Sequence, residues 1–166
     1  MKQGVRVICA ALLFATLFIA GCAVPTRASV SKQSEIPLWH GRLAVKVESD
    51  QPQSFSAEFE LTGSAQTGAL TLYTPIGSTA AALSWSDQTA VMRTQGEVRT
   101  FDSLDALIKQ ALGTEIPVAA LFAWLKGDNM IAAGWSADLS QHANGKITAR
   151  RAQPVPLAEL RLVLEK

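Results

Sequence analysis

The chain has 166 residues, of which 48% are hydrophobic and 17% are charged. This composition excludes an intrinsically disordered protein, and the length supports one domain with a sizeable core. The formal net charge is +1 and no basic run stands out, so we expect no nucleic-acid partner.

Residues 1–21 have the features of a lipoprotein signal peptide. Lys2 and Arg6 form a short positive start, residues 7–20 are almost wholly apolar, and small residues precede Cys22. The ending Ile-Ala-Gly-Cys resembles a bacterial lipobox, which implies that the Cys22 sulfur receives a diacylglyceryl group. The alternative is an ordinary secretory signal with a chance cysteine.

The stretch that follows is expected to be a flexible, acylated tether over residues 22–37. It is rich in Pro, Ser, Thr, Lys and Gln and has few large apolar residues. An extra edge strand is disfavoured because Pro25 and Pro37 lack the N–H that a ladder needs. No disulfide is expected, since Cys9 lies in the signal peptide and Cys22 would carry lipid. The folded domain is then 38–166.

Apolar and polar residues alternate with a period of two along the first part of this domain, which is typical of half-buried strands. The alternating segments are 43–48, 55–61, 70–73, 80–85, 89–93 and 98–101. Residues that favour turns separate them. The pattern predicts an antiparallel meander of six strands.

One turn of the meander, Thr74–Ser78, carries a large apolar residue. Pro75 sets φ and Gly77 accepts a positive φ, so the pattern predicts a hairpin with Ile76 at its tip. Ile76 either folds back over the end of the core or enters something apolar outside the protein.

Helical spacing replaces the alternation after Asp102, the expected N-cap of a helix that ends at Gly113. A second short helix is expected to start at Pro117 and end at Gly127. The two helices should cross or plug the sheet.

The last part of the chain returns to the strand pattern. After a loop that contains Trp135, Asn144-Gly145 is a hairpin signal, and strands are expected at 146–150 and 159–165.

The sequence contains no recognisable catalytic or metal site. Its two histidines, His40 and His142, come without a nucleophile elbow, a cluster at metal spacing or a phosphate loop. Glu58 and Glu60 share a strand face, which is more typical of a solvated surface than of a catalytic pair. We therefore predict no catalytic residue, no metal and no cofactor.

Three stretches together resemble the LolB family of outer-membrane lipoprotein receptors. They are Trp39-His40-Gly41-Arg42-Leu43-Ala44-Val45, Thr74-Pro75-Ile76-Gly77-Ser78-Thr79, and Gly113-X-X-Ile116-Pro117-X-X-X-Leu121-X-X-Trp124-Leu125-X-Gly127. The resemblance implies a mainly β fold with short helices: an open, unclosed antiparallel β-barrel with a hydrophobic cavity that helices cover. The chain departs from the family after Trp135, where it is compressed and interrupted by prolines, so the number of strands there stays open.

The resemblance also implies site residues. In the family an exposed apolar residue at the hairpin tip is associated with membrane insertion, which points to Pro75, Ile76 and Gly77. The cavity would hold the acyl chains of other lipoproteins. Its expected wall residues are Leu43, Val45, Phe55, Phe59, Leu70, Leu72, Leu121, Trp124, Leu160 and Leu162.

The implied function is that of an outer-membrane lipoprotein acceptor. Its partners would be the periplasmic carrier LolA, acylated lipoprotein cargo and outer-membrane lipid, and we expect a monomer. The expected location is the periplasmic leaflet of the outer membrane, because Ala23 is not the aspartate that retains many lipoproteins in the inner membrane. The alternatives are a structural or lipid-binding lipoprotein that retains a lipid ligand, and a lipid hydrolase.

Overall fold

The structure of the chain is a computed structural model that describes residues 36–112 and 114–165. The signal peptide, Cys22 and most of the expected tether lie outside the described residues.

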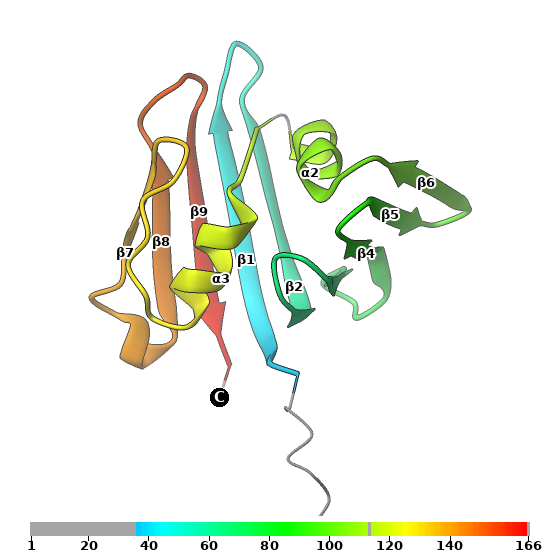
Figure 1. Cartoon of the computed structure of the whole chain (residues 1–166), viewed down its shortest axis with the longest axis horizontal. Helices are drawn as coiled ribbons and strands as arrows, with labels where there is room; N and C mark the ends of the chain where they lie inside the picture. The colour runs from blue at the N-terminus through cyan, green and yellow to red at the C-terminus, as the bar shows by residue number, and fades with distance from the viewer. Residues whose placement is uncertain (1–35, 113, 166) are drawn as a thin grey trace, which may run out of the picture. The chain divides into compact units, whose positions relative to one another are not determined.

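Nine strands form a single antiparallel sheet that is not closed into a barrel (Figure 1). The strands are β1 (Leu38–Glu48), β2 (Gln53–Gly63), β3 (Gly68–Tyr73), β4 (Thr79–Ser86), β5 (Thr89–Thr94), β6 (Glu97–Phe101), β7 (Trp135–Asp138), β8 (Lys146–Arg151) and β9 (Leu157–Leu164). Their order in the sheet is β6-β5-β4-β3-β2-β1-β9-β8-β7, and within the described residues no ladder joins β6 to β7. The prediction of a mainly β, open antiparallel fold is therefore confirmed.

The register brings the apolar positions of neighbouring strands together on one face. Val45 in β1 lies opposite Phe55 in β2 and Leu160 in β9. Leu43 in β1 likewise lies opposite Leu162. Side chains that face each other across a ladder point to the same side of the sheet. The alternation in the sequence thus becomes a continuous apolar face over the middle strands.

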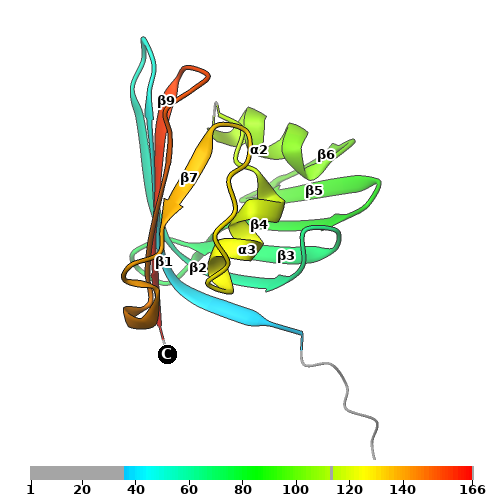
Figure 2. The same cartoon turned by 60° about the vertical axis from the view of Figure 1, so that its left-hand side comes forward.

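Two short helices, α2 (Leu104–Leu112) and α3 (Val118–Leu125), lie on this apolar side. The sheet bends sharply, and Figure 2 shows both helices within the angle of the bend. α2 packs against β5 and β6, and α3 passes in front of β1 and β9 in Figure 1. Neither these helices nor any other helix in the described ranges has the length and apolar character that a membrane span requires.

Both helices start one position away from the prediction. Ser103, not Asp102, caps α2, because the Ser103 Oγ accepts a hydrogen bond from the backbone N–H of Ala106 at 3.1 Å. Pro117 directly precedes the first residue of α3, and Gly127 follows its end with φ of +87°.

β7 is a strand where the sequence predicted a loop. It has only four residues, from Trp135, so its alternation is too short to stand out against the loops on either side. Pairing with β8 stabilises it as the edge of the sheet. The connection from β7 to β8 contains the short helix η1 (His142–Asn144), and Gly145 ends it in a left-handed conformation.

Two tryptophans attach α3 to this side of the sheet. Trp124 in α3 and Trp135 in β7 are fully buried, and their ring centroids lie 6.5 Å apart. The Trp124 Nε1–H donates to the carbonyl of Met130 at 2.8 Å, and the Trp135 Nε1–H donates to that of Glu115 at 2.9 Å. Because both indole groups are satisfied, these rings can be buried without leaving a polar atom unpaired.

Candidate functional site

An apolar pocket of about 380 Å³ lies between the bent sheet and the two helices. Only two of its lining residues, Gln53 and Ser54, are polar, and none is charged. Nine of the ten residues expected at a cavity wall line it: Leu43, Val45, Phe55, Phe59, Leu70, Leu72, Leu121, Leu160 and Leu162. The pocket has the size and apolar character of a small-molecule binding site. That it holds acyl chains stays a prediction.

The tenth expected wall residue, Trp124, does not line the pocket. Helix α3 turns Leu121, Phe122 and Leu125 toward the pocket, while Trp124 packs against Trp135. The presence of Trp in an apolar helix does not reveal which side of the helix it occupies, because α3 is apolar nearly all round.

Helix α2 supplies a part of the wall that the sequence analysis did not assign. Leu104, Leu107, Ile108 and Ala111 all line the pocket, and Leu107 is fully buried. These residues recur at intervals of three and four, so the helical periodicity could have identified them as the buried side of α2.

An aromatic cluster stands at one side of the pocket. Phe122 of α3 lies edge-on to Trp39, with ring centroids 5.5 Å apart, and 6.4 Å from the ring of Trp85. The Trp85 Nε1–H donates to the carbonyl of Ser64 at 3.0 Å, which fixes the indole ring. The cluster joins α3 to β1 and β4 and gives this part of the pocket a packed wall.

The tip between β3 and β4 is held in shape by its own hydrogen bonds. The backbone N–H groups of Thr74 and Gly77 donate to Ser78 and Thr74 carbonyls, respectively, both at 2.8 Å. Gly77 has φ of +80°, which a residue with a side chain rarely adopts. Ile76 is 90% exposed, so its side chain does not cover the core.

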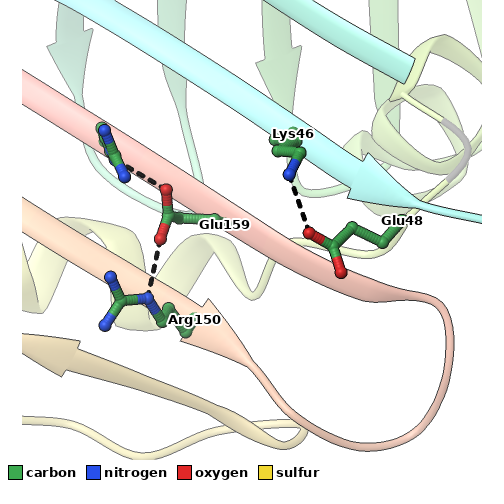
Figure 3. A network of polar contacts seen from close by, with 5 residues as sticks. Lys46, Glu48, Arg150 and Glu159 are labelled. Carbon is green, nitrogen blue, oxygen red and sulfur yellow. Dashed lines mark hydrogen bonds and ion pairs between the residues drawn. The ribbon is translucent and has the colours of Figure 1, made fainter. Parts of the chain in front are cut away.

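A group of paired charged residues from β1, β8 and β9 lies on the other face of the sheet (Figure 3). Glu159 pairs with Arg150 at 2.7 Å and with Arg161 at 2.6 Å. The hydrogen bond from Arg150, followed by that from Arg161, lowers the pKa of Glu159. Lys46 pairs with Glu48 at 2.8 Å, and this hydrogen bond raises the pKa of Lys46. This part of the outer face therefore carries charges that pair with one another.

Glu58 and Glu60 are both exposed on this face of the sheet, and each contacts a different partner. Glu58 pairs with Arg42 at 3.4 Å, and Glu60 accepts a hydrogen bond from the Tyr73 hydroxyl at 2.8 Å. That hydrogen bond raises the pKa of Tyr73. Among the described residues there is also no group of three side chains suited to hold a metal ion.

An open antiparallel sheet with an almost uniformly apolar pocket beneath two helices places the chain among open β-barrel proteins. The chain belongs to the LolB family, because the family model described as outer membrane lipoprotein LolB matches residues 38–156. The LolB family consists of lipoprotein-localisation receptors that handle lipoprotein cargo, and not of enzymes.

Individual relatives support the same assignment. An outer-membrane lipoprotein LolB of Bordetella pertussis is 34% identical to this chain. The alignment, 189 positions long, covers 98% of this chain and 95% of that protein. A relative of the same name from Cupriavidus metallidurans is 29% identical, and the alignment covers 78% of this chain and 65% of that protein. Another, from Shewanella loihica, is 30% identical, and the alignment covers 72% of this chain and 56% of that protein. These names support the expected location at the outer membrane through a lipid anchor.

Proposed function

We propose that this chain is the outer-membrane acceptor that takes lipoproteins from the carrier LolA and inserts them into the outer membrane. The observation that carries the proposal is the pocket. A member of a family of lipoprotein-localisation receptors has a partly open apolar pocket without a single charged lining residue. Such a space suits acyl chains and no polar metabolite.

The pocket can hold an acyl chain without an external energy source. Each buried methylene is stabilised by about 0.8 kcal/mol relative to water, so a chain in the pocket is protected during transfer. A bilayer buries the same methylenes at least as well, so release into the membrane runs downhill. The handover in this proposal therefore requires no nucleotide.

Ile76 is the residue that we assign to membrane contact. It stands at the tip of a hydrogen-bonded turn between Pro75 and Gly77 and is 90% exposed. A large apolar side chain held out into water by a shaped turn has no role in packing the core. Insertion into the outer membrane would bury it and bring the protein to the lipid surface.

Cys22 is the residue that we assign to the permanent anchor. More than one acyl chain at the N-terminus of the mature protein would hold it stably at the membrane, because each methylene adds its own burial energy. The folded domain would then reach carrier and membrane through the tether.

A reconstituted transfer tests the proposal. The Cys22→Ala chain without its signal peptide is mixed with LolA loaded with a palmitate-labelled lipoprotein, and liposomes are added afterwards. We expect the label to move from LolA to this chain and then to the liposomes. Label that stays on this chain would support a lipid-binding protein instead, and release of free fatty acid would support a hydrolase.

A further inference from the structure

The exposure of its lining residues shows where the pocket opens. Phe55 and Phe59 lie on the same face of β2, yet Phe55 is 37% exposed and Phe59 only 3%. Ala111, near the end of α2, is the exposed lining residue on the opposite side. The exposed lining residues lie at the start of β2 and in the second half of α2, and we place the mouth of the pocket there.

The part of the pocket away from this mouth has buried walls. Leu61, two positions beyond Phe59 on the same face of β2, is 4% exposed. Leu125 of α3 and Trp85 of β4 are buried lining residues as well. An acyl chain in the pocket would therefore have one end exposed to solvent at the mouth and the other end buried beside α3.

The mouth carries one polar side chain that faces the pocket. Gln53 is two positions before Phe55, so its side chain lies on the same face of β2, whereas the side chain of Ser54 points to the opposite face. The Gln53 carboxamide offers a donor and an acceptor, and it makes no hydrogen bond to other described residues. It is placed to bond the polar end of a ligand.

The charges around the mouth restrict what that polar end can be. No lysine or arginine lines the pocket, so nothing in it neutralises a carboxylate or a phosphate. Asp50 lies in the connection that leads into β2, and its negative charge disfavours an anionic head group. A neutral ester or amide has neither problem and can accept a hydrogen bond from Gln53.

We propose that an acyl chain lies in the pocket with its tail toward α3 and its ester or amide carbonyl at Gln53, and that the site prefers such neutral acyl derivatives to free fatty acids. This inference rests on the proposed function, since it names the ligand class and the orientation within the same pocket. It also makes Gln53 the residue that positions the cargo's acyl linkage.

Photocrosslinking tests the orientation without carrier or membrane. The probes are two palmitoyl ethanolamides, one with a diazirine next to the carbonyl and one with a diazirine near the methyl end, each bound to the soluble Cys22→Ala chain. We expect the first to label the region around Phe55 and Ala111, and the second to label Phe122 and Leu125. The reverse pattern would overturn the orientation while leaving the proposed function intact. No labelling by either probe, with no uptake of lipoprotein from LolA, would overturn both.

Competition binding tests the role of Gln53. Palmitoyl ethanolamide and palmitate each displace a fluorescent acyl probe, and we expect the wild-type protein to bind the ethanolamide more tightly. Gln53→Leu should weaken ethanolamide binding about 3- to 10-fold, the value of one hydrogen bond. Gln53→Glu, which can accept but not donate when ionised, should weaken it at least as much.

Gln51→Leu is the matched control, because Gln51 is exposed in the same connection but does not line the pocket. It should bind both ligands as the wild type does. Equal affinity of the wild type for the two ligands, or equal effects of Gln51→Leu and Gln53→Leu, would overturn the assignment of Gln53.

Discussion

Replacing Ile76 with glutamate separates folding from membrane contact. Ile76 is 90% exposed and lies in a turn whose hydrogen bonds are made by other residues, so the free energy of unfolding should change by less than about 0.5 kcal/mol. Burial of an isoleucine side chain in lipid contributes about 1.5–3 kcal/mol. Loss of that contribution alone weakens membrane contact roughly 10- to 150-fold, and the glutamate charge weakens it further.

The measurement is a two-step transfer with the soluble Ile76→Glu chain. It should take labelled lipoprotein from LolA at the wild-type rate, because the tip lies outside the pocket lining. It should then deliver little label to liposomes and accumulate as a loaded soluble complex. The thermal midpoint is recorded on the same sample.

Ile131→Glu is the control for a new charge on the surface. Ile131 is 75% exposed but lies in the connection before β7, far along the chain from the tip. This variant should deliver cargo normally. The reasoning is refuted if Ile76→Glu delivers as well as the wild type, or if it unfolds several degrees earlier, because the side chain would then act in folding and not in lipid.

Three further predictions concern the anchor, the pocket and the outer face. Cys22→Ala in the full chain should abolish metabolic palmitate labelling of the purified protein, and label that persists would contradict the lipobox assignment. Leu72→Ala, at a half-buried pocket wall, should lower the free energy of unfolding in denaturant by less than Ile147→Ala, which empties a packed site and costs roughly 2–5 kcal/mol; equal losses would indicate a filled interior. Because the folded-state pKa of Glu159 is lowered, its carboxylate stabilises the fold above its ordinary pKa and loses this effect as the pH falls through the lowered value. Glu159→Gln should therefore be less stable than the wild type at pH 7 by at most about 1 kcal/mol, and chemical denaturation at acid pH should show no difference.

Most of the strands could be predicted from the alternation of apolar and polar residues in the sequence. Segments such as 43–48 and 55–61 alternate over enough residues for the pattern to be read, and both lie within observed strands. β7 could not be found this way, since four residues contain only two repeats and its pairing with β8 depends on tertiary contacts. The same limit explains the N-cap, where Asp102 and Ser103 are both suitable residues and only the backbone direction selects Ser103.

The sequence predicted most residues that line the pocket, but not which of them are exposed and which are buried. Alternation tells which face of β2 Phe55 and Phe59 share, but their very different exposures depend on tertiary packing that the spacing does not encode. Sequence spacing likewise could not assign Trp124 to the far side of α3. Which side of an all-apolar helix faces a cavity is decided by its neighbours, here Trp135 and the backbone that accepts the indole N–H.

The unpaired edges of the sheet give the pocket a capacity that can change. About 380 Å³ is near the lower end of the range of roughly 300–1,000 Å³ that is typical of ligand pockets, which is little room for cargo with several long acyl chains. In the described part of the chain β6 and β7 are not bonded to each other, so moving them apart breaks no ladder hydrogen bond between them. In a closed barrel the same expansion would expose a row of backbone donors and acceptors. An increase in volume here would require bending of the sheet and displacement of α2, and under the proposed function it would let one pocket accommodate acyl chains of different number and length.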